Sequence, residues 1–254
     1  MHITFLGTGA ADWRREDADF RAFTSTRING DLLIDGTMAV YERLEGHTGE
    51  IKDVLYTHNH RDHFDIELLK KLAPVRAHIH KSWAHKVQAE GVEVIPFECN
   101  EKFAVGGYEV MALPSNHLTE DWNDITVHYV VTHNGKSVFY ATDGAWITTR
   151  EWHGLLNYEL DAAIFDATIG DSYPGDYRIF EHNNLDMVRL MLKTMRCPMF
   201  ADKPAFGRIH GVIKPDAPVF ITHLARTLHP SQAELVKSLE GEFVVAYDGF
   251  EADI

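Results

Sequence analysis

The sequence predicts an α/β fold, because short apolar strands and amphipathic helices alternate along its 254 residues. An Asn-Gly turn signal at residues 29–30 lies between two β-prone runs, and the second run leads into Asp-Gly at 35–36. The same hairpin and Asp-Gly plan recurs at 134–135 and 143–144, which indicates a weak internal duplication. A chain of this length can bury a substantial core, and we expect a single domain over residues 1–254.

The remaining elements are predicted in order from their periodicity. The first strand, HITFLG, ends in Gly-Thr-Gly, where the missing Cβ atoms allow a sharp turn or a close approach. Besides the two hairpins, further strands are predicted at 51–57, 75–80, 93–97, 108–115, 161–167, 217–223 and 243–249. Helices are predicted at 65–72, 83–90, 183–195 and 230–239.

Charge and cysteine content exclude several classes of protein. The balance of 38 acidic against 24 basic residues gives a formal net charge of −14, which opposes binding to large nucleic acids or anionic membranes. The two cysteines, Cys99 and Cys197, lack CxxC spacing, so neither a disulfide framework nor a thiolate zinc site is indicated. The first residues lack the features of a signal peptide, and no apolar run could span a bilayer. We therefore expect a soluble cytoplasmic protein.

The stretch YTHNHRDHFD at residues 56–65 predicts a metal site. Imidazole nitrogens and carboxylate oxygens are the ligands that zinc, manganese or iron accept without cysteine. His58 and His60 alternate on an extended segment and point the same way, while Asp62 and His63 lie past the turn. This loop could serve two adjacent metal ions. The competing interpretation is a solvated polar turn whose histidines occur by chance, which such spacing makes improbable.

Three later polar residues each follow an apolar strand directly. His117 comes after the strand at 108–115, Asp143 after the second hairpin, and His223 after the strand at 217–223. Polar groups at strand ends are held by rigid elements, so they are good candidates for the remaining ligands of a two-metal site.

This order of motifs resembles the metallo-β-lactamase-fold superfamily, and the resemblance extends from FLGTG and LLIDG over most of the chain. It implies an αββα sandwich, in which two mixed sheets from similar halves are each covered by helices. It also implies two divalent metal ions per chain, which could be zinc, manganese or iron. By this resemblance, His58, His60 and His117 would hold one ion, Asp62, His63 and His223 the other, Asp143 would bridge both, and Asp35 would be a structural carboxylate behind the ligands.

Within that superfamily, FLGTGAA and the stretch from IFDAT to EHNN resemble the phosphodiesterase branch. This branch includes the cyclic phosphodiesterases of the carbon–phosphorus lyase pathway and the transfer-RNA 3′-processing nucleases. The resemblance makes His182 the proton donor to the leaving group and Asp166 its partner. The chain departs from these families, because Glu181 replaces the usual glycine, FDAT replaces HEAT, and both the cysteine-rich extra metal site and the long basic arm are missing.

The predicted function is therefore a dinuclear metal-dependent hydrolase, with a small or cyclic phosphodiester as substrate. A metal-bound hydroxide would attack phosphorus, oriented by Asp62, and His182 would act as general acid. Alternatives are hydrolysis of a lactone or thioester, a transfer-RNA-processing type of nuclease, a redox-type member, and a noncatalytic metal-binding module. A homo-oligomer is compatible with the sequence, and the physiological substrate stays open.

Other residues are assigned to the periphery of the site or to the fold. His78, His80 and His85 are expected to be structural, and His128 and His133 are expected to be exposed strand residues. The Pro/Gly-rich loop at 201–218 is a candidate functional loop. Candidates for substrate contacts are Arg226, Arg208 and Trp146.

Overall fold

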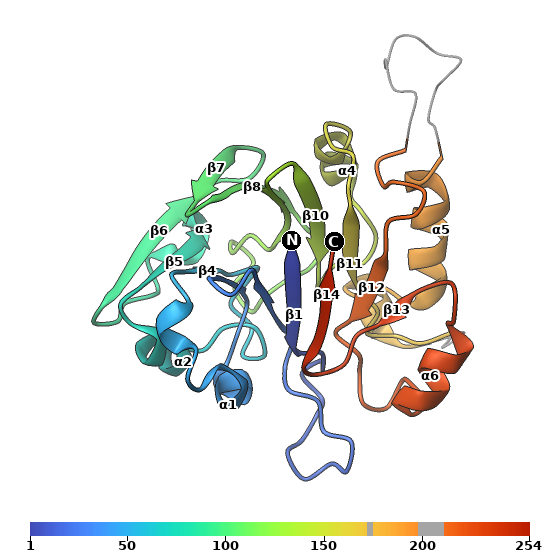
Figure 1. Cartoon of the computed structure of the whole chain (residues 1–254), viewed down its shortest axis with the longest axis horizontal. Coiled ribbons are helices and arrows are strands. Elements are labelled where there is room, and N and C mark those ends of the chain that lie inside the picture. The colour runs from blue at the N-terminus through green and yellow to red at the C-terminus, as the bar shows by residue number, and fades with distance from the viewer. Residues whose placement is uncertain (172–174, 198–210) are drawn as a thin grey trace.

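The computed structural model of the protein, which describes residues 1–171, 175–197 and 211–254, contains two seven-stranded mixed sheets packed face to face (Figure 1). The first sheet has the strand order β14 (Phe250–Asp253), β1 (His2–Gly7), β2 (Ser25–Ile28), β3 (Leu32–Ile34), β4 (Asp53–Leu55), β5 (Val75–His80), β6 (Val92–Phe97). The second has the order β13 (Val244–Val245), β12 (Val219–Thr222), β11 (Ala162–Asp166), β10 (Lys136–Ala141), β9 (Val127–His133), β8 (Tyr108–Pro114), β7 (Lys102–Val105).

Helices cover the outer face of each sheet, which gives the four layers expected of an αββα sandwich. The first sheet is covered by α1 (Tyr41–Leu44), α2 (Ile66–Leu72) and α3 (Lys81–Ala84). The second is covered by α4 (Thr149–Leu155), α5 (Leu185–Met195) and α6 (Gln232–Ser238). Short 3₁₀ turns lie at η1 (Met38–Val40), η2 (Thr48–Glu50) and η3 (Tyr177–Phe180).

Three apolar cores correspond to these layers. The central core lies between the sheets and includes Phe5 of β1, Tyr129 of β9 and Phe220 of β12, all almost fully buried. Two outer cores lie between each sheet and its helices. Burial of this apolar surface is the main favourable term for joining the layers. No helix in the described part of the chain is long and apolar enough to cross a membrane.

The two halves repeat one topology, as the duplicated sequence plan predicts. In each half an antiparallel hairpin, β2–β3 or β9–β10, is followed by parallel strands. Both Asn-Gly turns have positive φ at both residues, 48° and 88° in the first hairpin and 49° and 76° in the second. After β13 the chain leaves the second sheet, and the C-terminal strand β14 joins the first sheet antiparallel to β1, so the two chain ends lie side by side (Figure 1).

Two predictions of secondary structure and exposure are wrong. The helix expected at 83–90 is the four-residue α3, and the chain leaves helical geometry after residue 84 to lead into β6. His128 is not an exposed strand residue: only 1% of its surface is accessible, because this face of β9 packs under α4 and pairs with Glu151. His78 is also buried, where it pairs with Asp53 at 2.8 Å, which agrees with a structural role.

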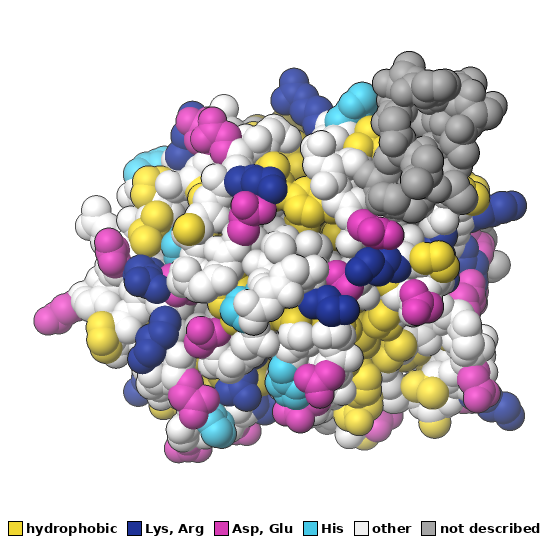
Figure 2. Space-filling model, turned by 45° about the horizontal axis from the view of Figure 1, so that its top comes forward, with side chains coloured by type: hydrophobic (Ala, Val, Ile, Leu, Met, Phe, Trp, Pro, Cys, Tyr) yellow, Lys and Arg dark blue, Asp and Glu magenta, His cyan; other side chains and the backbone are white. Residues whose placement is uncertain are grey.

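The charged surface is mixed in sign over the face that Figure 2 shows. Lys and Arg side chains alternate there with Asp and Glu side chains, and no broad basic patch appears on this face.

Candidate metal centre

The polar residues singled out in the sequence meet at one edge of the two sheets, where β3, β4, β10, β11 and β12 end. Parallel strands run in one direction, so the segments that follow them emerge at the same edge. Three groups of side chains there have ligand atoms within 4.8 Å of one another and could each hold a metal ion. The first group is His58, His60, His117 and Asp143; the second is Asp62, His63, Asp143 and His223; the third, which overlaps the second, is Asp143, Asp166, His182 and His223.

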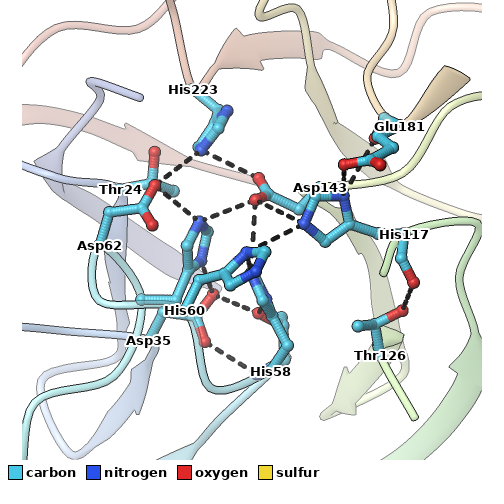
Figure 3. A network of polar contacts seen from close by, with 12 residues as sticks. Thr24, Asp35, His58, His60, Asp62, His117, Thr126, Asp143, Glu181 and His223 are labelled. Carbon is cyan, nitrogen blue, oxygen red and sulfur yellow. Dashed lines mark hydrogen bonds and ion pairs between the residues drawn. The ribbon is translucent and has the colours of Figure 1, made fainter. Parts of the chain in front are cut away.

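Three imidazole nitrogens converge in the first group (Figure 3). Nδ1 of His60 lies 3.0 Å from Nε2 of His58 and 3.1 Å from Nε2 of His117. Asp143 Oδ2 lies 3.5 Å from His58 Nε2 and 3.7 Å from His117 Nε2. Burial lowers the pKa of His117 to about 4 although Asp143 opposes this, so the ring is neutral and its Nε2 lone pair is free at pH 7.

The second group shares Asp143 with the first, and its members face both carboxylate oxygens. His223 Nε2 lies 3.0 Å from Asp143 Oδ1 and 3.4 Å from Asp62 Oδ2, and His63 Nε2 lies 3.2 Å from Asp143 Oδ2. Burial alone would raise the pKa of Asp62, but the charge of His63 and the hydrogen bond from His223 lower it to about 2. Asp62 is therefore an ionised carboxylate that faces His63 and His223.

The outer nitrogen of each histidine faces a polar partner that orients its ring. His63 Nδ1 lies 2.8 Å from Asp35 Oδ2, and His117 Nδ1 lies 3.2 Å from the Glu181 carbonyl oxygen. His60 Nε2 faces the carboxylate of Glu120 at 3.7 Å. Partners of this kind fix which ring nitrogen presents a lone pair, a common feature of histidines that bind metals.

The donor set fits divalent metal ions. When the outer nitrogen of each ring carries the ring's proton, the inner nitrogens face one another at about 3 Å as lone pairs without a donor, and a cation between them satisfies every lone pair. His63 Nε2 is completely buried and makes no hydrogen bond of good geometry to the described residues. Burying an unpaired polar atom is costly, so such an atom aimed into a cluster of ligands indicates a bound group.

Asp166 and His182 form a pair beside the second group. His182 Nδ1 lies 2.9 Å from Asp166 Oδ2, and its ring stacks on His223 with centroids 5.3 Å apart. Burial disfavours the charged imidazole, but Asp166 and then Asp143 outweigh it and raise the pKa of His182. A ring held in this way can carry a proton to the edge of the metal cluster.

Hydrogen bonds fix the segment that carries Asp143 against its neighbours. Asn183 Nδ2 donates to the Gly144 carbonyl at 2.8 Å, and Asn183 Oδ1 accepts from the Trp146 backbone N–H at 2.8 Å. Asn116 Nδ2 donates to the Ala145 carbonyl at 2.9 Å. Because these asparagines are adjacent in sequence to His182 and His117, the three segments of the site are tied together.

The peripheral candidates take different positions. Arg226 lines a cavity of about 600 Å³ that none of the candidate metal ligands lines, and its Nε lies 3.1 Å from the Asp12 carbonyl oxygen. Trp146 lines an apolar groove against α5 together with Trp152 and Leu190. Arg208 and residues 201–210 of the predicted functional loop lie outside the described residues.

Sequence reasoning missed the two threonines that contact the histidines. Thr57 Oγ1 lies 2.9 Å from His58 Nδ1, and Thr168 Oγ1 lies 2.7 Å from His223 Nδ1. Thr57 directly precedes the histidine motif, and Thr168 follows Asp166 by two positions. In the sequence, only their closeness to predicted site residues could have indicated a role for these threonines.

Solved structures share this fold over nearly their whole length. The metallo-beta-lactamase fold protein YhfI from Bacillus subtilis has a TM-score of 0.70 and 17% identity, over 99% of this chain and 98% of that chain. A diphosphatase from the PhnP family has a TM-score of 0.70 and 18% identity, over 99% and 97%. Human tRNase Z, short form, has a TM-score of 0.67 and 17% identity, over 100% and 99%. No match was found among curated proteins.

A family model gives the decisive comparison. The model described as the beta-lactamase superfamily domain matches residues 33–196, which is more than half of the chain and includes the histidine motif, His117, Asp143, Asp166 and His182. The chain belongs to the beta-lactamase superfamily and is a hydrolase of the metallo-β-lactamase fold.

Proposed function

We propose that this protein is a dinuclear metal-dependent phosphodiesterase that acts on a small or cyclic phosphodiester. The observation that carries the proposal is the Asp166–His182 pair, held at 2.9 Å beside the second group of metal-binding residues. Hydrolysis of a phosphodiester with a poor leaving group needs a proton donor at the departing oxygen, whereas a thioester does not, because a thiolate leaves unprotonated.

The metal-binding residues divide into two sets that share one carboxylate. His58, His60 and His117 would hold one ion and Asp62, His63 and His223 the other, with Asp143 shared by both: its Oδ2 faces His58 and His63, and its Oδ1 faces His223. Bound divalent ions would polarise a phosphoryl oxygen and lower the pKa of a coordinated water. Zinc and manganese both accept this nitrogen and oxygen ligand set.

The protein's own residues would manage the protons. Asp62 stays ionised at neutral pH because its pKa is about 2, so it can accept a hydrogen bond from the attacking water and orient it. His182 would donate the proton on Nε2 to the departing oxygen, since Nδ1 is engaged with Asp166. Asp166 is completely buried, so its negative charge acts on His182 with little screening by solvent.

The first test compares bis-(p-nitrophenyl) phosphate with a lactone and a thioester, using zinc- or manganese-loaded protein and its Asp62→Asn variant. Diester hydrolysis that falls with this substitution supports the proposal and directs the search to cyclic phosphates. Turnover of the lactone or thioester alone would contradict it and assign acyl chemistry to the same metal site.

The role of His182 is tested by the choice of leaving group. His182→Ala should slow an alkyl phosphodiester about 10²–10⁴-fold, because the poor leaving group needs a proton. It should slow bis-(p-nitrophenyl) phosphate far less, because nitrophenolate leaves unprotonated. His153→Ala, on the exposed end of α4, is the matched control and should behave as wild type on both substrates. Equal losses for both substrates would exclude the proton-donor role.

A further inference from the structure

Two buried threonines make the same set of bonds in the two halves of the molecule. In the first half the backbone N–H of Thr57 donates to Asp35 Oδ1 and its hydroxyl donates to Asp35 Oδ2, both at 2.8 Å. The same hydroxyl oxygen lies 2.9 Å from Nδ1 of His58. Asp35 also serves His63 directly, at 2.8 Å from Nδ1.

The second half repeats these bonds with different strands. The backbone N–H and the hydroxyl of Thr168 both donate to Asp166 Oδ1, at 2.6 Å each. The hydroxyl oxygen lies 2.7 Å from Nδ1 of His223, and Asp166 Oδ2 lies 2.9 Å from Nδ1 of His182. Each buried aspartate therefore serves one histidine directly and a second histidine through a threonine.

The protons in this arrangement can be counted. Asp166 receives three hydrogen bonds, from the backbone N–H and the hydroxyl of Thr168 and from Nδ1 of His182, so its carboxylate acts only as an acceptor. The single hydroxyl proton of Thr168 is then directed to Asp166. The oxygen of Thr168 must accept at His223, so Nδ1 of that ring carries a proton.

We propose that Thr168 is a positioning residue that fixes the tautomer of His223, so that Nε2 presents its lone pair toward Asp62 and Asp143. Asp166 therefore orients two rings: His223, expected to bind metal, through Thr168, and His182, expected to donate the proton, directly. Thr57 does the same for His58 in the first half. This inference rests on the proposed metal-binding role of His223, and it does not depend on which ester is hydrolysed.

The direct test is the protonation of the histidine rings in the wild-type chain. With zinc-loaded, ¹⁵N-labelled full-length protein, long-range ¹H–¹⁵N correlation should show a proton on Nδ1 of His223 and of His58 and none on Nε2. His223→Gln assigns the His223 signal by its loss. A proton on Nε2 of His223 in the zinc-loaded protein would overturn the proposal, and this result requires no threonine variant to fold.

Variants then test whether the hydroxyl contributes to metal binding. Thr168→Val should weaken zinc binding about 10–100-fold in competition with a chromophoric chelator, as loss of an orienting partner does. Thr168→Ser keeps the hydroxyl and should bind zinc as wild type does. Thr222→Val is the matched control, since Thr222 is also buried next to His223 but its hydroxyl has no hydrogen-bond partner among the described residues.

The outcomes separate this inference from the proposed function. Serine and valine variants that lose zinc affinity equally would show that Thr168 only packs, and an unchanged Thr168→Val would show that its hydroxyl does not matter; either result overturns the proposal. Zinc affinity and ring protonation are read without substrate. Failure to hydrolyse diesters would therefore reject the phosphodiesterase and leave the role of Thr168 standing.

Discussion

Asp143 and His223 both adopt backbone conformations that non-glycine residues rarely occupy. Their φ angles are 59° and 57°, and Asp35 in the equivalent position of the first half has φ of 53°. Such conformations cost about 1–3 kcal/mol each and persist where the surroundings leave no alternative. Ser115 donates a hydrogen bond to the Asp143 carbonyl, and Asn183 donates one to the Gly144 carbonyl, which holds Asp143 in this conformation. The strained residues Asp143 and His223 are therefore also candidate metal ligands.

Gly144 tests how tightly Asp143 is held. A Cβ at this position would lie 2.6 Å from Cε1 of His128, whose ring cannot retreat because Nδ1 is bonded to the buried Glu151 at 2.5 Å. Gly144→Ala should displace Asp143, lower stability by about 1–3 kcal/mol and weaken zinc binding at least about tenfold. Gly107→Ala is the control, since its Cβ would make an ordinary 3.6 Å contact. Wild-type zinc affinity in Gly144→Ala, measured by chelator competition, would contradict this view.

At the scale of elements, Asp161 joins β10 to β11 just before β11 begins. Its carboxylate accepts from the Ser137 backbone N–H at 2.9 Å, from Lys136 at 3.1 Å and from Lys214 at 2.7 Å. Burial would raise its pKa, but the hydrogen bonds from Lys214, Ser137 and Lys136 together lower it. These hydrogen bonds fix the start of β11 against β10, its parallel neighbour. Asp143 follows β10 and Asp166 ends β11, so both site residues depend on this pairing.

The lowered pKa of Asp161 predicts the sign of a pH effect. The stabilisation is fully present above the unfolded-state pKa of about 3.9 and is lost as pH falls through the lower folded-state pKa. Asp161→Asn should therefore reduce the free energy of unfolding by about 1–3 kcal/mol at pH 7, with a difference that shrinks below pH 4. Urea unfolding of the metal-free protein measures this. Glu240→Gln, on the exposed surface, should show no such difference; a pH-independent loss in Asp161→Asn would refute the electrostatic explanation.

The candidate metal centre lies where the two sheets of the molecule meet at one edge. His58 and Asp62 follow β4 of the first sheet, whereas Asp143 and His223 follow strands of the second. The sheets are also joined by the central core, where Phe5, Phe220 and Phe250 contact one another with ring centroids 5.3 to 6.2 Å apart. A bound metal ion would add a polar link between layers that are otherwise held by apolar packing.

Metal binding should therefore stabilise the entire fold. Zinc at a hundred times its dissociation constant should add about 2.7 kcal/mol, which corresponds to a rise in Tm of about 5–10 °C for a chain of this size. Differential scanning calorimetry with zinc and with a chelator measures the shift. Asp143→Asn should greatly reduce it, because both groups use this carboxylate. An unchanged Tm with zinc would contradict a metal site that links the sheets.

Local sequence pattern predicts most of the strands and helices, both hairpins and the set of polar residues that meet, but it does not predict β7, β14, α1 or α4. The predicted features depend on local pattern: Asn-Gly favours a tight turn, and polar residues directly after parallel strands emerge at a common edge. Its failures are local as well, since the helix expected at 83–90 is cut short where the chain turns toward β6.

The hydrogen-bond partners of the site residues depend on tertiary packing. His128 is buried because Glu151, 23 positions away in sequence, packs against it, and Thr168 meets His223 across 55 positions. Arg226 is bonded to a loop 214 positions earlier. The physical reason is that a hydrogen bond between distant residues exists only after the sheets and helices have packed, and no local pattern encodes which side chains will then face each other.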